Sequence, residues 1–450
     1  MQVIVIDTTS LGDRSYLIHD GTQALVIDPQ RDIDRVTAAA SDAGVEITHI
    51  AETHIHNDYV TGGLELAQVT GAAYLVNAAD PVKFDRTPIS DGEAVQVGSL
   101  SVQAVATPGH TVTHLSYIVT DADEQAVFSG GSLLFGSVGR TDLVDPAQTT
   151  ELTHAQYASV RRLTAEANEQ AQLYPTHGFG SFCSSGPATG ANSSTVEEQL
   201  QANHALTDED EDHFVRELIA NLSAYPTYYA HMGPANTNGP APVDLSVPEP
   251  LSEAELTQRL RDGEWVVDLR NRVAFSQEHL DGAVSFEYGD GSSFTTFLGW
   301  VIPWGERITL AGTQDDVESA IRDLSRIGID SPDAALGAGP RDIAPRADVA
   351  DYPRVDWAGL LAERPEGEAI LDVRRTDEFA GTHIEGAINI PLHEIVTRID
   401  EVPQSRIWVH CGSGYRASVA ASLLQRAGKD PVHVDASFGE AADSGVTLQH

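Results

Sequence analysis

An internal duplication in the second half of the chain limits its fold more than any other feature of the sequence. The segment VVDLRNRVAFSQEHLDGAV (266–284) matches ILDVRRTDEFAGTHIEGAI (370–388), and Asp, Arg, His and Gly recur at one constant offset of 104 residues. Four matches in register argue against coincidence. We therefore expect two copies of one α/β domain, at residues 250–345 and 350–450. The Pro-, Gly- and Asn-rich segment 225–252 before them is typical of a linker.

The first part of the chain has a different pattern. Residues 1 to about 135 contain short apolar runs separated by turns, with a helical pattern between two of them, and helical patterns dominate from 146 to about 222. This order predicts a layered α/β sandwich over residues 1–240. The sequence has no apolar run of about 18 residues, and its first residues carry no basic stretch or cleavage site. We expect no membrane partner and a cytoplasmic location.

The charge of the chain is strongly acidic. Asp and Glu number 67 against 27 Lys and Arg, so the formal net charge is −40, and Lys83 and Lys429 are the only lysines. Such a surface repels itself in dilute buffer, whereas molar salt screens it. We therefore expect a halophilic protein, and no nucleic-acid partner. An acidic module for a basic partner would need a local acidic tract, and only TDEDED (207–212) has that form.

A cluster of metal-binding residue types follows one predicted strand. In ETHIHNDYVTGG (52–63), His54, His56 and Asp58 occupy alternate positions, so their side chains share a face and can converge. His110 in ATPGHTVTH and His177 in YPTHG also follow strands at turns. Imidazoles and carboxylates suit Zn²⁺ or Fe²⁺. These five residues are the candidate metal ligands, and Asp58 is also a candidate catalytic carboxylate.

The motifs of this part resemble a known family. THIHNDYVTGG, TPGHTVTHLSY, FSGGSLLFGSVGRTDL and YPTHG are similar to those of the metallo-β-lactamase fold, in particular its glyoxalase II and persulfide dioxygenase branch. In that family the first motif reads HxHxDH, so Tyr59 stands where a histidine helps to bind a second metal. Gly131 stands where the family has an aspartate that bridges two metals or completes a two-His-one-carboxylate triad.

These two replacements change the metal site that the resemblance implies. A second metal would keep only Asp58 and His177, which are too few for tight binding. A first site of His54, His56 and His110 remains, with the open position that a catalytic metal needs. We therefore expect one Zn or Fe ion, for which Asp58 could supply the missing carboxylate. The alternative is a degenerate domain that binds no metal.

A reactive thiol is predicted near the C-terminus. RIWVHCGSGYRASVAASLLQRAG (406–428) has the pattern of a strand, a glycine-rich turn and a helix, with Cys411 at the base of the turn. Backbone N–H groups and the positive helix end favour a nucleophilic thiolate there, and Arg416 adds a charge for an anionic substrate. The segment resembles the active loop of rhodanese-type sulfurtransferases, whose cysteine carries persulfide sulfur. The first repeat has no cysteine, so we expect it to be catalytically silent.

Three other residues have a functional and a structural interpretation. Cys183 follows His177 by six residues and is either a thiol near the metal or a small packed residue. Arg140 and Asp142 in GSVGRTDL lie either at the substrate pocket that the family resemblance implies or in a structural ion pair. The two cysteines are far apart in sequence, which favours a reducing compartment over a disulfide.

Three functions remain open from the sequence. The first is a persulfide dioxygenase-like metal domain coupled to rhodanese-type sulfur transfer. The second is a glyoxalase II-like thioester hydrolase that uses metal-bound water. The third is a sulfurtransferase with a metal-free, degenerate lactamase domain. The expected partners are small thiol, persulfide or thioester substrates, and the sequence leaves a homo-oligomer open.

Overall fold

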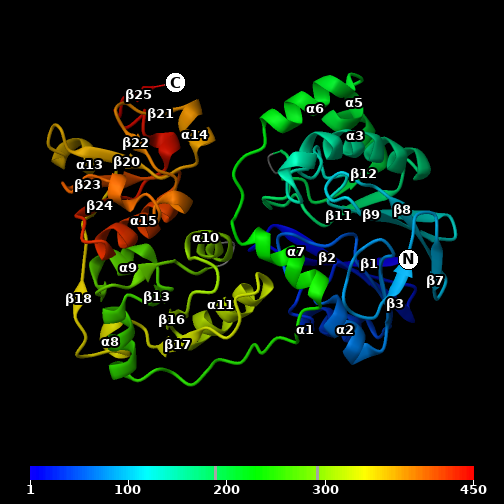
Figure 1. The fold of residues 1–450 in the computed structure, drawn as a ribbon, viewed down its shortest axis with the longest axis horizontal. Coiled ribbons are helices and arrows are strands. Elements are labelled where there is room, and N and C mark those ends of the chain that lie inside the picture. Colours follow the sequence, from blue (N-terminus) through cyan, green and yellow to red (C-terminus); the bar gives the residue numbers. More distant parts are fainter. Residues whose placement is uncertain (187–189, 290–292, 450) are drawn as a thin grey trace. The chain divides into compact units, whose positions relative to one another are not determined.

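A computed structural model describes residues 1–186, 190–289 and 293–449 (Figure 1). The chain forms two compact units. One comprises Met1–Val243 with Ser325–Gly328, and the other comprises Asp244–Leu324 with Ile329–His450. Within the described ranges, no helix has both the length and the apolar character needed to cross a bilayer.

The first unit is built on two six-stranded sheets. The first sheet has the order β1-β2-β3-β4-β5-β6, and the second has the order β12-β11-β10-β9-β8-β7. The strands of the first sheet are β1 (Gln2–Thr8), β2 (Asp13–His19), β3 (Gln23–Ile27), β4 (Glu46–Ala51), β5 (Ala73–Asn77) and β6 (Thr87–Ile89). Those of the second are β7 (Ala94–Val97), β8 (Leu100–Ala106), β9 (Leu115–Asp121), β10 (Glu124–Gly130), β11 (Gln172–Pro175) and β12 (Ser194–Thr195). The helices are α1 (Asp34–Ala43), α2 (Gly63–Thr70), α3 (Thr149–Glu166), α4 (Val196–Ala202), α5 (His204–Thr207), α6 (Glu211–Ala220) and α7 (Tyr229–Asn238).

Three apolar clusters separate the layers of this unit. Alternate residues of a strand face opposite sides of its sheet, and β2 and β3 show this plainly. Tyr16 and Ile18 lie in the cluster between the two sheets, whereas Leu17 packs with α1 and α2 on the outer side of the first sheet. Val127 of β10 packs with α3 and α6 outside the second sheet. The layers are therefore helix, sheet, sheet, helix, and the predicted αββα sandwich is confirmed.

Strand direction places the candidate ligands at one edge of the sandwich. β8 and β10 are both antiparallel to β9, and β11 is parallel to β10, so β8, β10 and β11 end at the same edge of the second sheet. The loop after β4 joins this edge, because the backbone N–H of Leu115 donates to the carbonyl of Thr53 over 2.7 Å. Residues after β4, β8, β10 and β11 therefore meet.

The second unit contains two parallel sheets with corresponding strand orders. These are β15-β13-β16-β17 and β22-β20-β23-β24-β19. The first repeat contains α8 (Glu253–Asp262), β13 (Trp265–Asp268), α9 (Arg272–Gln277), β14 (His279–Leu280), β15 (Val284–Ser285), α10 (Phe294–Val301), β16 (Ile308–Gly312), α11 (Gln314–Arg326), β17 (Asp333–Leu336) and α12 (Pro340–Ile343). It is followed by β18 (Val349–Ala350), β19 (Arg354–Val355), α13 (Trp357–Glu363), β20 (Ala369–Asp372), α14 (Thr376–Gly381), β21 (His383–Ile384), β22 (Ile388–Asn389), β23 (Ile407–His410), α15 (Tyr415–Arg426), β24 (Pro431–Val434) and β25 (Leu448–Gln449).

The duplicated residues make the same contacts in both repeats. In the first repeat, Arg270 pairs with Asp268 at 2.6 Å and also donates to the carbonyl of Glu278. His279 hydrogen-bonds the carbonyl of Phe275 and stacks on its ring. The contacts recur 104 residues later, in the pairs Arg374–Asp372 and His383–Phe379. The shared motif therefore ties the end of the central strand to the following helix and has a structural role.

Candidate metal centre and Cys411 loop

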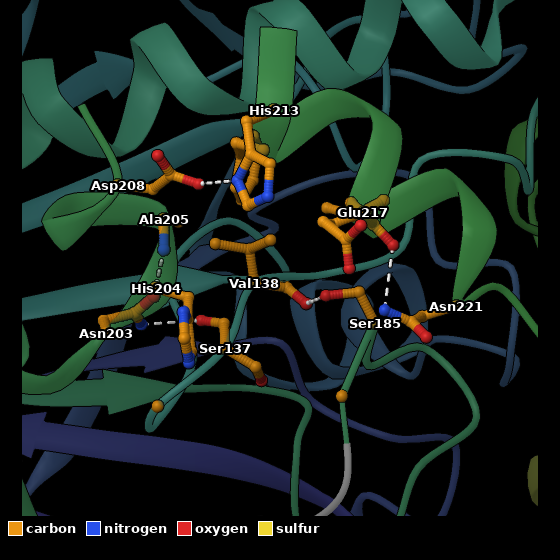
Figure 2. Close-up of a pocket in the computed structure, with 14 residues that line it drawn as sticks. Ser137, Val138, Ser185, Asn203, His204, Ala205, Asp208, His213, Glu217 and Asn221 are labelled. Atoms are coloured by element: carbon orange, nitrogen blue, oxygen red, sulfur yellow. Dashed lines mark hydrogen bonds and ion pairs between the residues drawn. The ribbon is translucent and has the colours of Figure 1, made fainter. Parts of the chain in front are cut away.

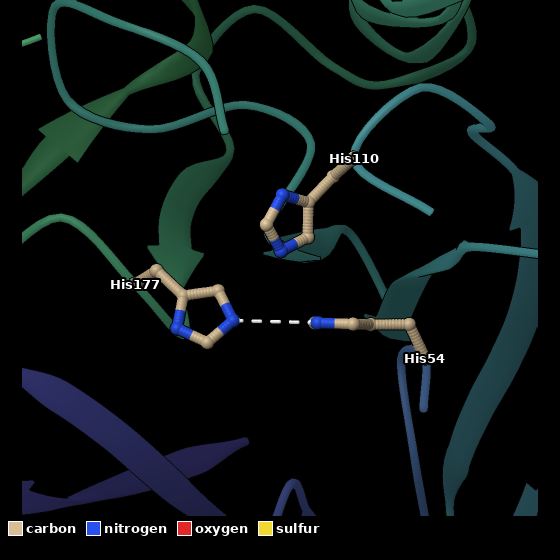
Figure 3. Close-up of side chains that lie close together, drawn as sticks. All are labelled: His54, His110 and His177. Carbon is tan, nitrogen blue, oxygen red and sulfur yellow. Dashed lines mark hydrogen bonds between the residues drawn. The ribbon is translucent and has the colours of Figure 1, made fainter. Parts of the chain in front are cut away.

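Three buried imidazoles meet at the edge of the sandwich. His54 follows β4, His110 follows β8 and His177 follows β11, and each is at most 1% exposed. One ring nitrogen from each lies within 4.8 Å of the other two, and the Nε2 atoms of His54 and His177 are 3.4 Å apart. Figure 3 shows the three rings turned toward a common point. This spacing suits a metal ion held by three nitrogens.

Hydrogen bonds at Nδ1 fix the direction of each ring. The Nδ1 of His110 lies 2.7 Å from the carbonyl oxygen of Arg140, and that of His177 lies 2.8 Å from Asp13 Oδ1. Since a carbonyl and a carboxylate only accept, both Nδ1 atoms donate. The Nε2 of His110 is buried and has no hydrogen-bond partner among the described residues. An Nε2 lone pair aimed at the common point is what a metal requires.

The third ring is held by a hydroxyl. His54 Nδ1 lies 2.8 Å from Thr53 Oγ1, whose own hydrogen is donated to Asp28 Oδ2 over 2.7 Å. The hydroxyl therefore accepts from His54, and the Nε2 of this ring also points to the centre. Burial, together with the neighbouring imidazoles, holds the pKa of His54 well below its usual value and lowers that of His110 to about 3. Both rings are therefore neutral, and each can offer an Nε2 lone pair to a metal.

The structure has no room for a side chain at position 131, where the family that the motifs resemble has an aspartate. A Cβ atom on Gly131 would lie 2.1 Å from His110 Cδ2 and 2.7 Å from His110 Nε2. A Cβ on Gly139 would lie 2.7 Å from His110 Nδ1. The ring of His110 therefore occupies the space that a carboxylate at position 131 would need.

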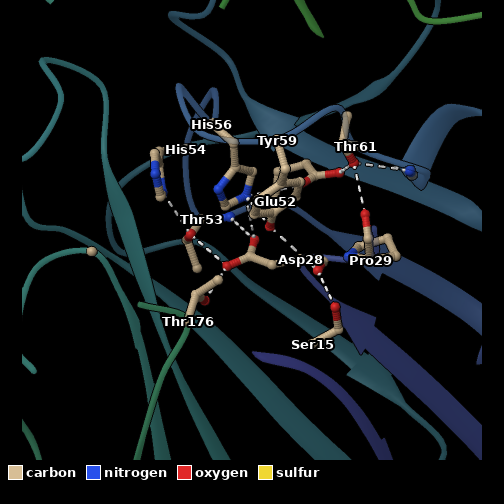
Figure 4. Close-up of polar contacts among 12 residues, drawn as sticks. Ser15, Asp28, Pro29, Glu52, Thr53, His54, His56, Tyr59, Thr61 and Thr176 are labelled. Carbon is tan, nitrogen blue, oxygen red and sulfur yellow. Dashed lines mark hydrogen bonds and ion pairs between the residues drawn. The ribbon is translucent and has the colours of Figure 1, made fainter. Parts of the chain in front are cut away.

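The structure groups the ligands differently from the expected set of His54, His56 and His110. His56 Nε2 is 2.9 Å from the hydroxyl of Tyr59 and 3.3 Å from a carboxylate oxygen of both Asp28 and Glu52 (Figure 4). Burial alone would lower the pKa of His56, but these carboxylates raise it to about 9. The Nε2 of His56 is thus engaged by these partners, and its buried Nδ1 has no hydrogen-bond partner among the described residues. The ligand atoms of His54, His110 and His177 form one group, whereas His56 groups with Asp58 and His177.

Asp58 lies beside His177. Its Oδ2 is 3.1 Å from His177 Nδ1, and its buried Oδ1 has no hydrogen-bond partner in the described part of the chain. It also belongs to a second group of ligand atoms, with His56 and His177. Burial opposes ionisation, but His177 and then His56 hold the pKa of Asp58 below its usual range. In turn, the Asp58 and Asp13 carboxylates hold the pKa of His177 well above its ordinary value despite its burial.

The remaining candidates of this unit have structural partners. Burial and the nearby Asp58 carboxylate raise the pKa of Cys183 well above its usual value, so this fully buried thiol stays protonated. The guanidinium of Arg140 pairs with both oxygens of Asp142 at 2.7 Å and donates to the carbonyl of Ser223. This ion pair fixes the carbonyl that holds His110.

The Cys411 loop has the predicted form of a strand, a turn and a helix. Cys411 follows β23, is 1% exposed, and its Sγ accepts the backbone N–H of Gly414 at 3.2 Å, just before α15. Arg416 does not offer a free charge, because it pairs with both oxygens of Glu378, at 2.6 and 2.9 Å. Its guanidinium still lies next to the loop, since a Cβ on Gly412 would be 3.0 Å from Arg416 Nη2.

A cavity of about 510 Å³ lies between α6 and the segments around Val138 and Ser185 (Figure 2). Asp208 and Glu217 line it, and Asp208 hydrogen-bonds His213 at 2.6 Å. None of the three clustered imidazoles lines it. Its acidic wall does not suit an anionic ligand.

A four-layer αββα sandwich with a histidine cluster at one sheet edge defines a metallo-β-lactamase-type metal domain. The sequence model of the metallo-beta-lactamase superfamily matches residues 11–177, and that of the rhodanese-like domain matches residues 356–441. The chain therefore carries a metallo-β-lactamase domain and, at its C-terminal end, a rhodanese-like domain. The comparison finds one rhodanese-like domain where we expected two. The first repeat nevertheless has the same strand order and the same motif contacts as the second.

Individual relatives are similar to the chain over different lengths. Persulfide dioxygenase ETHE1 of Bos taurus is 29% identical over 206 residues, which are 44% of this chain and 71% of the relative. Hydroxyacylglutathione hydrolase of Acidiphilium cryptum is 32% identical over 136 residues, which are 30% of this chain and 54% of the relative. The crystal structure of a metallo-beta-lactamase from Staphylococcus aureus superposes with a TM-score of 0.66 at 26% identity, covering 74% of this chain and 98% of that one.

Sequence reasoning missed several residues that shape the two sites. Asp13 holds His177 from β2, and Glu378 pairs with Arg416 from α14. Neither residue lies in the quoted ligand motifs of the metal domain or in the Cys411 loop. Glu52 and Asp28 each stand at the end of a strand, as ligand residues do, and that position could have drawn attention to them.

Proposed function

We propose that the metal domain oxidises a low-molecular-weight persulfide at one metal ion, and that the rhodanese-like domain transfers sulfur through Cys411. The convergence of the His54, His110 and His177 Nε2 atoms on one buried point carries this proposal. Two similarities support the proposal: the chain is similar to a persulfide dioxygenase, and it carries a rhodanese-like domain. The buried Nε2 of His110, which has no hydrogen-bond partner within the described ranges, fits a metal, and imidazole donors suit iron as well as zinc.

The oxidation has a defined balance. A persulfide RSSH, O₂ and water give the thiol RSH and sulfite, so the outer sulfur loses four electrons and O₂ gains them. An iron ion at the three imidazoles would supply the oxygen chemistry. Asp13 and the Arg140 carbonyl hold two of the rings in place. Asp58 is ionised and lies beside His177, and its Oδ1 has no hydrogen-bond partner among the residues that the structure describes, so it is placed to accept the S–H proton.

Sulfur transfer follows from the Cys411 loop. The Cys411 thiolate attacks the outer sulfur of RSSH, the S–S bond breaks, and RS⁻ leaves as the thiol after taking a proton. Cys411 then holds a persulfide, which an acceptor such as sulfite converts to thiosulfate and free Cys411. The Gly414 N–H, 3.2 Å from Sγ, stabilises negative charge on the sulfur.

The second candidate is a thioester hydrolase. Three histidines are a donor set of hydrolytic zinc sites, and Gly131 supplies no carboxylate. Zinc at this centre would supply a water whose pKa is about 7. The similarity to hydroxyacylglutathione hydrolase supports this candidate.

Metal reconstitution separates the candidates. The chelated, metal-free protein is reloaded with Fe²⁺ or Zn²⁺, and O₂ uptake with a persulfide is measured beside cleavage of an acyl-thiol ester. We expect O₂ uptake by the iron form, retained in Cys411→Ser, while thiosulfate sulfur transfer is lost in that variant. Thioester cleavage by the zinc form alone would favour the hydrolase. Sulfur transfer as the sole activity, insensitive to chelation, would leave only a sulfurtransferase.

A further inference from the structure

A second cavity of the metal domain lies against both loops that carry the imidazoles. It has a volume of about 470 Å³. Ile55 and Asn57, which alternate with the ligand residues of the first loop, line one side, and Thr111 and Val112, directly after His110, line another. Residues from α7 complete its wall. A molecule in this cavity therefore lies next to the segments that hold the metal-binding rings.

The cavity carries a positive charge that is rare in this chain. Lys83 lines it and is exposed to solvent. The other lysine, Lys429, is buried and donates its ammonium group to the carbonyl of Val402. Across residues 1–186, 190–289 and 293–449, the Lys83 ammonium makes no ion pair. In a chain with a net charge of −40, a cation that is free to bind an anion stands out.

The other groups of the wall set the character of the ligand. Val112 and Val144 line the cavity and are 51% and 46% exposed, so they offer apolar surface for methylene groups. Asp80 also lines the wall, but its carboxylate is buried and accepts a hydrogen bond from Thr113. Asp80 therefore does not cancel the charge of Lys83 at the open side of the cavity.

We propose that this cavity binds the non-reacting part of the thiol substrate, and that Lys83 selects a substrate with a carboxylate on a short aliphatic stem. The inference rests on the proposed function of the metal domain. A volume of about 470 Å³ falls within the usual range of small-molecule sites. The acidic cavity of Figure 2 lacks both the cation and the neighbouring ligand loops.

The test compares two persulfides that differ in one group, those of 3-mercaptopropionate and 3-mercaptopropanol. In the iron-loaded protein, Lys83→Gln should raise KM for the carboxylate substrate about threefold at low salt, the effect of one exposed ion pair. Its kcat, and the KM for the alcohol, should not change. Arg86→Gln is the matched control, because it removes one nearby positive charge whose guanidinium donates to the carbonyls of Ala78 and Asp80.

The outcomes distinguish this inference from the function on which it rests. If Lys83→Gln leaves both KM values unchanged, or raises both equally, the assignment of Lys83 is wrong while the persulfide activity stands. If the wild-type protein consumes neither persulfide, the proposed function fails. In that case the affinity of metal-loaded wild type and Lys83→Gln for 3-mercaptopropionate is measured by calorimetry. Equal affinities would overturn the assignment of Lys83.

Discussion

Replacing Gly131 by alanine should empty the metal centre. The new Cβ would lie 2.1 Å from His110 Cδ2, whereas ordinary contacts begin near 3.4 Å, so the ring must move by roughly 1 Å. Gly139 and the hydrogen bond to the Arg140 carbonyl also restrict the movement of the ring. Overpacking of this kind costs about 1–3 kcal/mol, and the lost hydrogen bond adds about 1 kcal/mol.

The loss of metal affinity in Gly131→Ala should be larger than its loss of folding stability alone would give, because one of the three metal-binding nitrogens leaves the centre. Misplaced outer partners alone cost 10–100-fold in affinity, so we expect a loss of at least about 100-fold. The assay is metal content per chain by mass spectrometry after dialysis against a graded series of chelators, with the unfolding temperature of the metal-free protein beside it. Gly381→Ala, where a Cβ meets open space, is the control.

Gly131→Asp extends the same test. A simple restoration of the family triad would make this variant bind iron more tightly. Our reasoning predicts the opposite, because the first atom of the side chain already collides with His110. A metal content equal to that of wild type in Gly131→Ala, or a higher iron affinity in Gly131→Asp, would refute the packing argument.

Three further perturbations have defined outcomes. His177→Gln should lose the bound metal, whereas His56→Gln should retain it, although the buried carboxylates left without His56 would destabilise the protein. The metal content of both variants is measured, and an equal loss of metal in the two would contradict the assignment. Burial raises the pKa of Asp80 from 3.8 to about 6, so the folded state binds the extra proton and this residue's contribution to stability falls as pH rises from about 4 to 6. At pH 8, Asp80→Asn should therefore unfold at a higher temperature than wild type, and its free energy of unfolding should be larger by at most about 3 kcal/mol. This difference should vanish near pH 4. Raising salt from 0.1 to 1 M shortens the screening length from about 10 to about 3 Å, so a chain of charge −40 should gain thermal stability, and a constant unfolding temperature would count against halophilic adaptation.

The layers of the first unit and the repeats of the second could be predicted from the sequence, because both follow from patterns that are local in the sequence. Alternation along the strands gave the two faces of each sheet, and the recurring Asp, Arg and His predicted a duplicated unit whose contacts prove equivalent. Strand ends also predicted that loops with histidines would meet.

The grouping of the ligands could not be predicted in the same way. Position on a loop places His54 and His56 on one face, but the Tyr59 hydroxyl and two carboxylates from strand ends engage the Nε2 of His56. His177 joins the cluster because Asp13, 164 residues away, fixes its ring. Likewise, Arg416 meets Glu378 only through the tertiary fold. Such long-range polar contacts have no local sequence signal.

Anomalous diffraction from crystals soaked in Fe²⁺, recorded on both sides of the iron edge, tests the central claim most directly. We predict one anomalous peak per chain, within bonding distance of the Nε2 atoms of His54, His110 and His177. A peak held instead by His56 and Asp58, or no peak among these rings, would contradict the account.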